Sequence, residues 1–249
     1  MALALVGDVA LSVFPSPLSR EQHAAGVAAM REEYGQFQFS KFDLGSLGCG
    51  QYDLGPFCSV VENDVVLDIG GCYGDTMCKF WRQAGVGGEI HVFEPVEENR
   101  RSILSVLQEM GGPGNVFVVP YGAWDCSAIA DIFVDSGCSS LTGGCFEREC
   151  PEFEKVKLKT IDDYVAENGL RSVDFIKMDI EGAEEKALLG ASETIARYRP
   201  KLAISVYHRF DDLTRIPAVI LEAFPGYRFN MRHYHRGFFE TVLYAVAGR

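Results

Sequence analysis

The sequence predicts an α/β protein with a doubly wound, Rossmann-like sheet of seven strands, mostly parallel with an antiparallel last strand, in a three-layer α/β/α arrangement. Three observations predict this class. Apolar runs alternate with helix-like segments from residue 65 onward, glycine-rich turns separate them, and the last two runs are joined by a loop too short for a crossover helix. The chain has 249 residues, of which 47% are hydrophobic, which is enough to bury a sizeable core.

The strands of this sheet are predicted from runs rich in valine, isoleucine, leucine and phenylalanine. In chain order they are 65–69, 89–93, 115–119, 174–178, 202–206, 227–231 and 241–246. The helices predicted between them are 74–84, 96–110, 161–167 and 183–197. Two further strands, 131–135 and 155–158, flank a cysteine-containing insertion near 129–158.

Residues 1–60 are predicted to form an N-terminal helical cap, and residues 61–249 the sheet domain. A helix is expected over 19–34 because Ser19 can cap it. The first 15 residues are apolar, but they lack a basic region, contain Asp8 and are too short to span a bilayer. We therefore expect strand or loop there, with a signal peptide as the alternative.

Composition argues against some partners. The formal net charge of −12 and a pI near 4.9 repel phosphate backbones, so no nucleic-acid partner is expected, and no membrane partner either. The eight cysteines contain no CxxC pair of the zinc-ribbon type, which favours reduced thiols and a cytoplasmic location. A metal site or disulfide at Cys138, Cys145 and Cys150 is the alternative.

The residues that follow the first and second strands of the sheet form a pattern typical of a cofactor-binding site. Asp68 precedes a turn containing Gly70, Gly71 and Gly74, where the backbone can bend sharply and approach a ligand. Glu94 ends the second strand, where such folds place an acid that accepts hydrogen bonds from ribose hydroxyls. Negative charge beside the turn suits a cationic ligand better than a pyrophosphate, so we predict S-adenosylmethionine. The nicotinamide alternative is weaker because Ile69 stands where the GxGxxG fingerprint needs glycine.

The chain resembles the FkbM-type methyltransferases, which have the class I methyltransferase fold. Five pieces carry the resemblance in the expected order. They are VVLDIGGCYGD at 65–75, VFEP at 92–95, LKTIDDY at 158–164, VDFIKMDIEGAE at 173–184 and FETVLYA at 239–245. The family usually has an alanine and an asparagine or similar residue in the glycine turn, where this chain has Gly71 and Cys72.

The resemblance implies S-adenosylmethionine as the cofactor and assigns residues to it. Asp68, Gly70 and Gly74, with Gly71 between them, are placed around its methionine part, and Glu94, followed by Pro95, at its ribose. The turn containing Ala123 and Trp124 is expected against the adenine. For Trp124 a core aromatic packed under the sheet is the alternative.

The catalytic candidates are Asp179, Glu181 and His208. Asp179 ends a strand, Glu181 follows two residues later, and His208 comes just after the next strand, at the sheet edge where α/β folds bind ligands. Such groups can take a proton from an oxygen acceptor, or together hold a divalent ion. The alternatives are a carboxylate bonded to backbone amides for Asp179 and a hydrogen-bonded strand-end residue for His208. Glu184 and Glu185 are expected in the first turn of a helix, where the helix dipole favours acids whatever the function.

An unusually basic loop joins the last two strands. It contains Arg232 and His235 and, together with Arg209, is predicted to contact a hydroxylated or anionic substrate. A solvated hairpin tip is the alternative.

Three functions remain open on the sequence. The first is an S-adenosylmethionine-dependent methyltransferase that acts on a small-molecule acceptor, at an oxygen of a sugar or natural-product scaffold, with nitrogen second. The second is a non-catalytic S-adenosylmethionine-binding module, favoured by Cys72. The third is a nicotinamide-dependent oxidoreductase. The acceptor and the oligomeric state do not follow from the sequence.

Overall fold

The computed structural model describes residues 5–6, 9–10, 12–14, 19–34, 47–134, 152–235 and 239–248. The chain forms two compact units, one made of Val61–Pro200 and the other of Met1–Val60 together with Lys201–Arg249. The predicted division into a cap of residues 1–60 and a domain of residues 61–249 stays a prediction. None of the described helices is long and apolar enough to cross a membrane.

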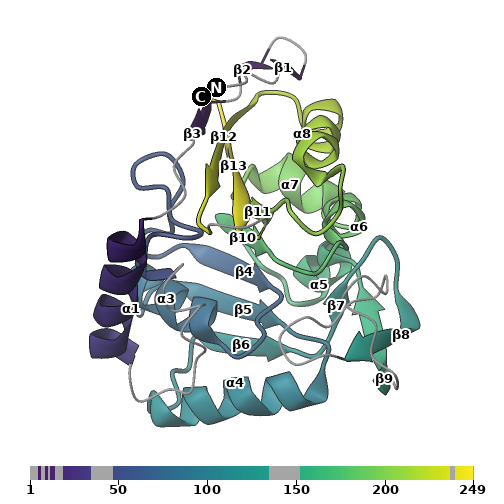
Figure 1. Cartoon of the computed structure of the whole chain (residues 1–249). Helices are drawn as coiled ribbons and strands as arrows, with labels where there is room; N and C mark the ends of the chain where they lie inside the picture. The colour runs from purple at the N-terminus through teal and green to yellow at the C-terminus, as the bar shows by residue number, and fades with distance from the viewer. Residues whose placement is uncertain are drawn as a thin grey trace. The chain divides into compact units, whose positions relative to one another are not determined.

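The unit Val61–Pro200 is built on four parallel strands (Figure 1). Their order is β10 (Phe175–Met178), β4 (Val65–Ile69), β5 (Glu89–Phe93) and β6 (Val116–Val119). Helix α3 (Asp75–Ala84) connects β4 to β5, and α4 (Glu97–Glu109) connects β5 to β6. Crossover helices of this kind let successive strands run in the same direction. Strands β4 and β5 have the predicted bounds.

Helices cover both faces of these strands, because successive side chains of a strand point to opposite sides. On one face of β5, the His91 ring lies 5.7 Å from the ring of Tyr164, and the Phe93 ring 4.8 Å from it. Tyr164 belongs to α5 (Ile161–Glu167). On the other face, α3 contacts β4 and β5, and Val92 lies beside Gly71.

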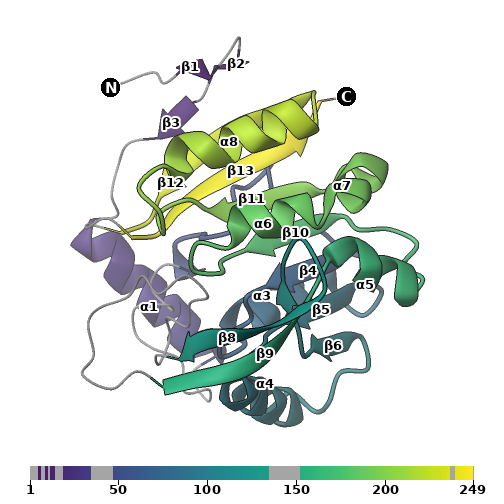
Figure 2. The same ribbon diagram turned by 90° about the vertical axis from the view of Figure 1, so that its right-hand side faces the viewer.

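A second, three-stranded sheet follows, in which β9 (Glu152–Lys159) lies between β7 (Gly122–Ala123) and β8 (Ala128–Val134). Strands β8 and β9, which fall largely within the predicted insertion, lie side by side in Figure 2. Strand β9 runs parallel to β7 and antiparallel to β8. This sheet has its own small core, made of Val96, Ile132, Val156 and Leu158. The predicted cluster Cys138, Cys145 and Cys150 lies outside the described residues. The described cysteines, Cys49, Cys58, Cys72, Cys78 and Cys126, are free thiols.

The single helix predicted over 183–197 is wrong. The structure has two helices there, α6 (Glu184–Leu189) and α7 (Ser192–Tyr198). The carboxylate of Asp162 accepts hydrogen bonds from the backbone nitrogens of Glu193 at 3.0 Å and Thr194 at 2.8 Å, which starts a new helix. At Gly190 a Cβ would lie 1.9 Å from the carbonyl oxygen of Trp124, so only glycine allows this approach.

The other unit contains the strand order β3 (Ser12–Phe14), β12 (Tyr227–His233), β13 (Thr241–Ala247) and β11 (Lys201–Ser205). Strand β13 is antiparallel to both β12 and β11, whereas β3 is parallel to β12. The predicted α/β class, with parallel strands and an antiparallel end, is therefore confirmed. Helix α8 (Asp212–Ala223) was not predicted, because Pro217 lies inside it and proline normally breaks a helix.

The N-terminal segment adds strands and a capped helix to this unit. Strands β1 (Leu5–Val6) and β2 (Val9–Ala10) pair antiparallel, in agreement with the expected strand or loop. Helix α1 (Arg20–Tyr34) has the predicted cap, since Ser19 Oγ accepts a hydrogen bond from the Gln22 nitrogen at 3.1 Å. The Gln22 side chain accepts in return from the Ser19 nitrogen at 2.8 Å, which completes a capping box.

Residues 47–60 are joined to the strands of this unit by buried polar contacts. Tyr234 Oη donates to the Gly50 carbonyl at 2.8 Å, and the hydroxyl oxygens of Tyr52 and Ser205 lie 3.2 Å apart. Tyr52 itself is only 2% exposed. These contacts explain why the first 60 residues group with the C-terminal strands.

Candidate active site

The glycine turn after β4 is held between the two neighbouring strands. The nitrogens of Gly70 and Gly71 both donate to the Phe93 carbonyl at 3.0 Å, and the Asp179 nitrogen donates to the Ile69 carbonyl at 3.0 Å. Gly70 has a φ of 87°, and a Cβ there would lie 2.0 Å from the Asp179 carbonyl oxygen. Both the left-handed backbone and the close approach therefore require glycine at this position.

Asp68 is completely buried and has partners within the protein. Its Oδ2 accepts a hydrogen bond from Thr76 Oγ1 at 2.6 Å, and its Oδ1 lies 3.2 Å from Lys177 Nζ. Lys177 Nζ also donates to the Gly70 carbonyl at 2.5 Å. Burial disfavours the charged ammonium, but the carboxylates around it, Asp68 foremost, outweigh that penalty and raise the pKa of Lys177.

This buried ion pair changes the role expected for Asp68. The sequence predicts that the negative charge of Asp68 attracts a cationic ligand, whereas the structure pairs this carboxylate with the ammonium of Lys177. The contact between Asp68 and the cofactor stays a prediction. The sequence placed Lys177 at the start of the segment expected to hold the chemistry but gave it no role, although a lysine inside the apolar run FIKM was a signal. Lys177 and Asp68 are register partners in the β10–β4 pair.

Glu94 is only 4% exposed and holds the turn from the end of β5. One carboxyl oxygen accepts a hydrogen bond from the Cys72 nitrogen and the other from the Val96 nitrogen, both at 2.9 Å. Burial raises the pKa of Glu94 to about 7, although these hydrogen bonds oppose the rise. The Asn99 side chain also hydrogen-bonds this carboxylate, whose two oxygens have about four lone-pair sites in all, so a site is left for a ligand's hydrogen bond.

The predicted acids lie in a turn after β10, which ends at Met178. Asp179 is partly buried, and Glu181 has a left-handed φ of 55°. Glu184 is 1% exposed, and its Oε1 accepts from the Ile180 nitrogen at 2.9 Å. Glu184 therefore serves the local fold, as expected, whereas the catalytic roles of Asp179 and Glu181 stay predictions.

The turn predicted to contact adenine is anchored by packing. Ala123 is buried in β7, and the Trp124 side chain packs against the small core of the three-stranded sheet. Lys186 Nζ lies 5.9 Å from the centre of the Trp124 ring. Pro95 lies 3.6 Å from the position that a Cβ of Gly122 would take. Trp124 is therefore a partly buried aromatic beside this small core, and contact of the turn with a cofactor stays a prediction.

The histidine candidates belong to the other unit, where two aromatic residues missed by the sequence analysis join them. The Tyr207 ring lies 4.2 Å from the His208 ring and 6.2 Å from the Phe239 ring. The Phe239 ring lies 6.2 Å from the ring of His235. We call Tyr207, His208, His235 and Phe239 the aromatic cluster.

The two arginines predicted to contact substrate have partners of their own. The guanidinium of Arg232 lies over the Tyr234 ring, 4.9 Å from its centre. Arg209 Nε lies 3.8 Å from Asp211 Oδ1, and the Arg209 nitrogen donates to Asp212 Oδ2 at 2.6 Å. Arg232, in β12, therefore packs on a neutral aromatic ring, whereas Arg209, which lies outside the loop joining β12 and β13, pairs with Asp211.

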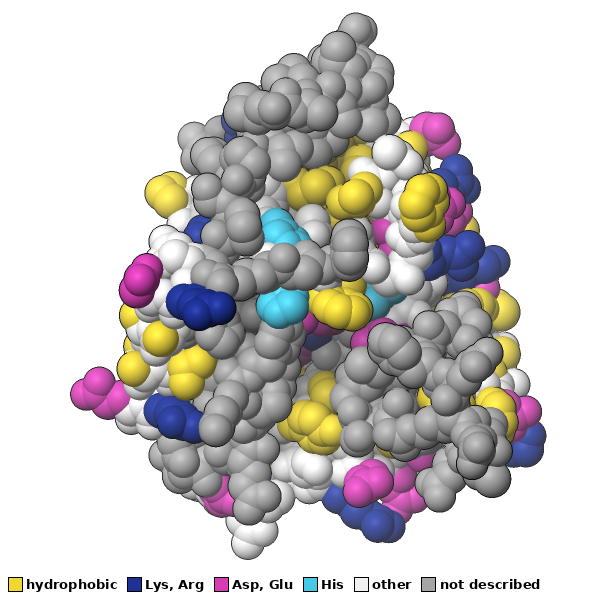
Figure 3. Space-filling view, viewed as in Figure 1, with side chains coloured by type: hydrophobic (Ala, Val, Ile, Leu, Met, Phe, Trp, Pro, Cys, Tyr) yellow, Lys and Arg dark blue, Asp and Glu magenta, His cyan; other side chains and the backbone are white. Residues whose placement is uncertain are grey.

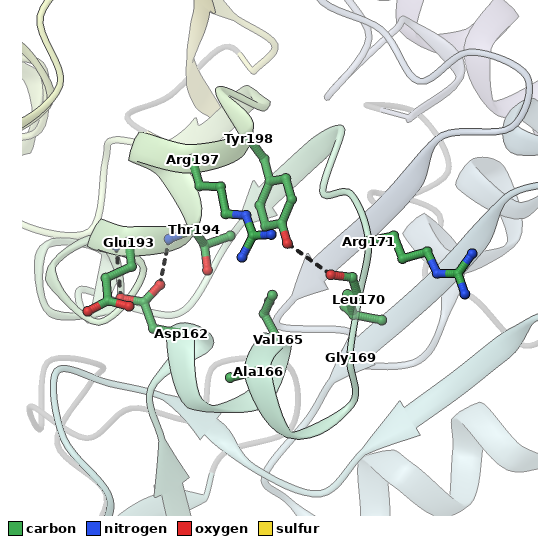
Figure 4. A pocket seen from close by; sticks show the side chains of 10 residues that line it. All are labelled: Asp162, Val165, Ala166, Gly169, Leu170, Arg171, Glu193, Thr194, Arg197 and Tyr198. Atoms are coloured by element: carbon green, nitrogen blue, oxygen red, sulfur yellow. Dashed lines mark hydrogen bonds between the residues drawn. The ribbon is translucent and has the colours of Figure 1, made fainter.

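A groove of about 420 Å³ lies between α5 and α7 (Figure 4). The Tyr198 hydroxyl donates to the Leu170 carbonyl across it at 2.9 Å, and Arg197 extends over it. None of the predicted site residues lines this groove. It is thus a feature of the helix layer and separate from the glycine turn.

Parallel strands covered by helices on both faces, a glycine turn after one strand and a buried acid at the end of the next define a class I methyltransferase-like α/β fold. Residues 68–235 match the family model described as the methyltransferase FkbM domain. The chain belongs to the FkbM methyltransferase family. This result confirms the resemblance predicted from the motifs.

Known proteins agree with this assignment. The structure of a methyltransferase FkbM from Methylobacillus flagellatus has a TM-score of 0.62 and 22% sequence identity, covering 88% of this chain and 58% of that one. A putative rRNA-methylase from Clostridium thermocellum has a TM-score of 0.50 and 11% identity over 76% and 88% of the two chains. Both show the fold alone.

A curated relative is similar over a shorter stretch. It is the 2-O-methyltransferase NoeI of Sinorhizobium fredii, which is 41% identical over 44 residues. That match covers 18% of each chain. The chain therefore spans less than two thirds of NoeI and of the Methylobacillus protein.

Proposed function

We propose that this protein transfers a methyl group from S-adenosylmethionine to an oxygen atom of a small molecule. The observation that carries the proposal is the pairing of the glycine turn with Glu94. The turn offers backbone at close range, and the buried carboxylate at the end of β5 holds it through the Cys72 nitrogen. Family membership supports methyl transfer as the reaction class.

The residues present suit the cofactor. The Glu94 carboxylate can accept hydrogen bonds from ribose hydroxyls through its remaining lone pairs. The turn of Gly70, Gly71 and Gly74 is held by three strands and is therefore preorganised before any ligand binds. S-adenosylmethionine, when bound, supplies an electrophilic methyl group on a sulfonium.

The chain's own contribution is then to orient the acceptor, exclude water and receive a proton. Asp179, at the carboxyl end of β10, and His208, after β11, are the groups proposed to receive the acceptor's proton, with Glu181 as a further candidate. A neutral imidazole nitrogen or a carboxylate can do this without a metal, so no divalent ion is included in the proposal. The relative NoeI is named a 2-O-methyltransferase, which supports oxygen over nitrogen as the accepting atom.

Two measurements test the proposal. Calorimetry should detect binding of S-adenosylmethionine and of S-adenosylhomocysteine, and Glu94→Ala should weaken both. A screen of sugars, phenols and amines should then yield S-adenosylhomocysteine with at least one acceptor. Binding without product across the screen would favour a non-catalytic binding module, and NADH binding without S-adenosylmethionine binding would favour the oxidoreductase alternative.

The catalytic assignment has a separate test. Asp179→Ala and His208→Ala should each reduce turnover while S-adenosylmethionine binding is retained. If both variants keep wild-type turnover, the proposed bases are wrong, although the reaction class can still hold.

A further inference from the structure

The groove between α5 and α7 belongs to one unit of the chain, Val61–Pro200, and lies away from the glycine turn. Its residues come from α5, from the loop after α5 and from α7. That loop enters β10 at its amino end, where the Asp174 nitrogen donates to the Val65 carbonyl at 2.9 Å. The predicted cofactor site lies at the carboxyl ends of the strands. None of the lining residues belongs to the turns at those ends, so a ligand in the groove is separate from the cofactor.

The floor of the groove is apolar and held in place. Val165 is 7% exposed, and Ala166 and Leu170 also line the floor. The Tyr198 ring borders it, with its hydroxyl hydrogen-bonded to the Leu170 carbonyl (Figure 4). Because this hydrogen bond fixes the ring before any ligand binds, the groove offers a preformed apolar surface. Its volume of about 420 Å³ is in the range of small-molecule sites.

One cation lies over this floor without a carboxylate partner among the described residues. The guanidinium of Arg197 lies 5.0 Å from the centre of the Tyr198 ring. Glu193 lies four residues earlier on α7, at a spacing that favours ion pairs along a helix, yet these two described side chains form none. Figure 4 shows Arg197 extending over the groove instead. A guanidinium that lies on an aromatic ring keeps its N–H groups available at its edge.

The acids that line the groove lie on its other side. The Asp162 carboxylate accepts hydrogen bonds from the backbone nitrogens of Glu193 and Thr194, so it is occupied by capping α7. Figure 4 shows Glu193 with Asp162 on one side of the groove and the Arg197 guanidinium on the side of the Tyr198 ring. The available positive charge is therefore next to the aromatic ring and the apolar floor.

An unpaired cation is significant because the protein is acidic overall. The formal net charge is −12. On the face drawn in Figure 3, many Lys and Arg side chains lie next to Asp and Glu side chains. A cation whose charge is already matched in this way contributes little to binding an anion. The combination of an unmatched guanidinium with an apolar floor selects an anion that carries an apolar group.

We infer that the groove between α5 and α7 binds a small monocarboxylate whose apolar body is about the size of a phenyl ring. The carboxylate accepts hydrogen bonds from the Arg197 guanidinium, and the ring packs on Val165, Leu170 and Tyr198. This site is separate from the one proposed for methyl transfer, and the inference does not rest on the proposed function.

Saturation-transfer NMR on the full chain tests the inference, with 3-phenylpropanoate as the probe. The amide 3-phenylpropanamide keeps the ring but has no charge, and acetate keeps the charge but has no ring. We expect saturation of the phenyl protons of 3-phenylpropanoate, with binding about tenfold weaker for the amide and for acetate. An excess of S-adenosylmethionine should not displace 3-phenylpropanoate, because the two sites are separate.

Matched variants locate the binding site. Arg197→Gln removes the charge and should weaken 3-phenylpropanoate binding about tenfold. Arg171→Gln is the control, because Arg171 is also exposed and borders the groove, but its side chain extends away from it in Figure 4. This control should bind like the wild type. Ala166→Trp should fill the groove and abolish binding. Since Arg197 and Ala166 are both exposed, thermal unfolding of their variants should match the wild type.

Several results would overturn the inference. They are the absence of 3-phenylpropanoate binding at millimolar concentration, equal binding of the amide, binding that survives Arg197→Gln, and displacement by S-adenosylmethionine. Stronger binding of 3-phenylpropylamine would also contradict it, because the acids would then dominate the groove. Calorimetry with S-adenosylmethionine on the same sample separates the two proposals. A protein that binds S-adenosylmethionine but not 3-phenylpropanoate refutes only the groove assignment, and the reverse result counts only against the proposed function.

Discussion

Replacing Lys177 by methionine should be strongly destabilising, because it removes one member of a buried ion pair. Methionine keeps the unbranched shape and most of the volume but has no charge. Asp68, which is 0% exposed, would keep the hydroxyl of Thr76 as its hydrogen-bond partner among the described residues but lose its counter-charge. The Gly70 carbonyl would also lose the ammonium that lies 2.5 Å away.

The size of the effect follows from the burial of both partners. Breaking a buried pair by removing one partner costs about 3–5 kcal/mol, because the remaining charge is left uncompensated. For a chain of this length, that loss lowers the melting temperature by roughly 6–20 °C. Much of the penalty comes from the stranded Asp68 charge, so the double variant D68N/K177M should be less destabilised than Lys177→Met alone.

Urea unfolding followed by circular dichroism measures these free energies, and Lys155→Met is the matched control. Lys155 Nζ lies 2.9 Å from Asp131 Oδ1, but these side chains are 74% and 58% exposed, so its loss should change little. A Lys177→Met protein within error of the wild type, or a double variant whose loss equals the sum of the single losses, would refute the reasoning.

Four further predictions concern the turn, two titrating groups and a helix cap. Gly70→Ala should abolish calorimetric S-adenosylmethionine binding, whereas Gly114→Ala, where a Cβ meets nothing within 4 Å, should not. Burial raises the pKa of Glu94 to about 7, so this side chain becomes charged between pH 6 and pH 8. Because the charged carboxylate is the better acceptor for ribose hydroxyls, the affinity for S-adenosylmethionine should rise over this range in the wild type and not in Glu94→Gln. Burial lowers the pKa of His91 below 6.5, so the unfolded chain binds a proton at this residue more tightly than the folded chain does. The free energy of unfolding in urea should therefore fall as the pH drops below about 6.5, and it should fall less in His91→Gln. Asp162→Ala removes two hydrogen bonds from the start of α7 and should lower the free energy of unfolding by about 0.5–2 kcal/mol in urea.

The parts of the fold that followed from the sequence are those specified locally. Strands β4 and β5 were predicted at their observed bounds because apolar runs are bracketed by turn residues. The break between α6 and α7 was missed because its cause is distant in the chain. Asp162 caps α7 from about 30 residues away, and Gly190 is required by the backbone of Trp124.

The same distinction applies to the candidate site. The turn and Glu94 were recognised because the acid follows a strand at a characteristic separation from the glycines. Tyr207 and Phe239 adjoin predicted candidates, but nothing in their local sequence indicates that their rings meet. That contact depends on the pairing of β11 with β13.

Lys177 shows how strand register can reassign a charge. The sequence of β4 alone shows an acid, Asp68, at the end of an apolar strand with no partner for its charge, which favours a ligand-binding role. Once β10 pairs with β4, Lys177 is placed opposite Asp68, and the pair is neutral overall. Glu94, at the end of the neighbouring strand, has no such matched lysine in register among the described strands, and burial raises its pKa to about 7, so a ligand that donates hydrogen bonds to it would favour its charged form. We therefore expect substitutions of Asp68 to act mainly on the stability of the turn, and substitutions of Glu94 mainly on cofactor affinity.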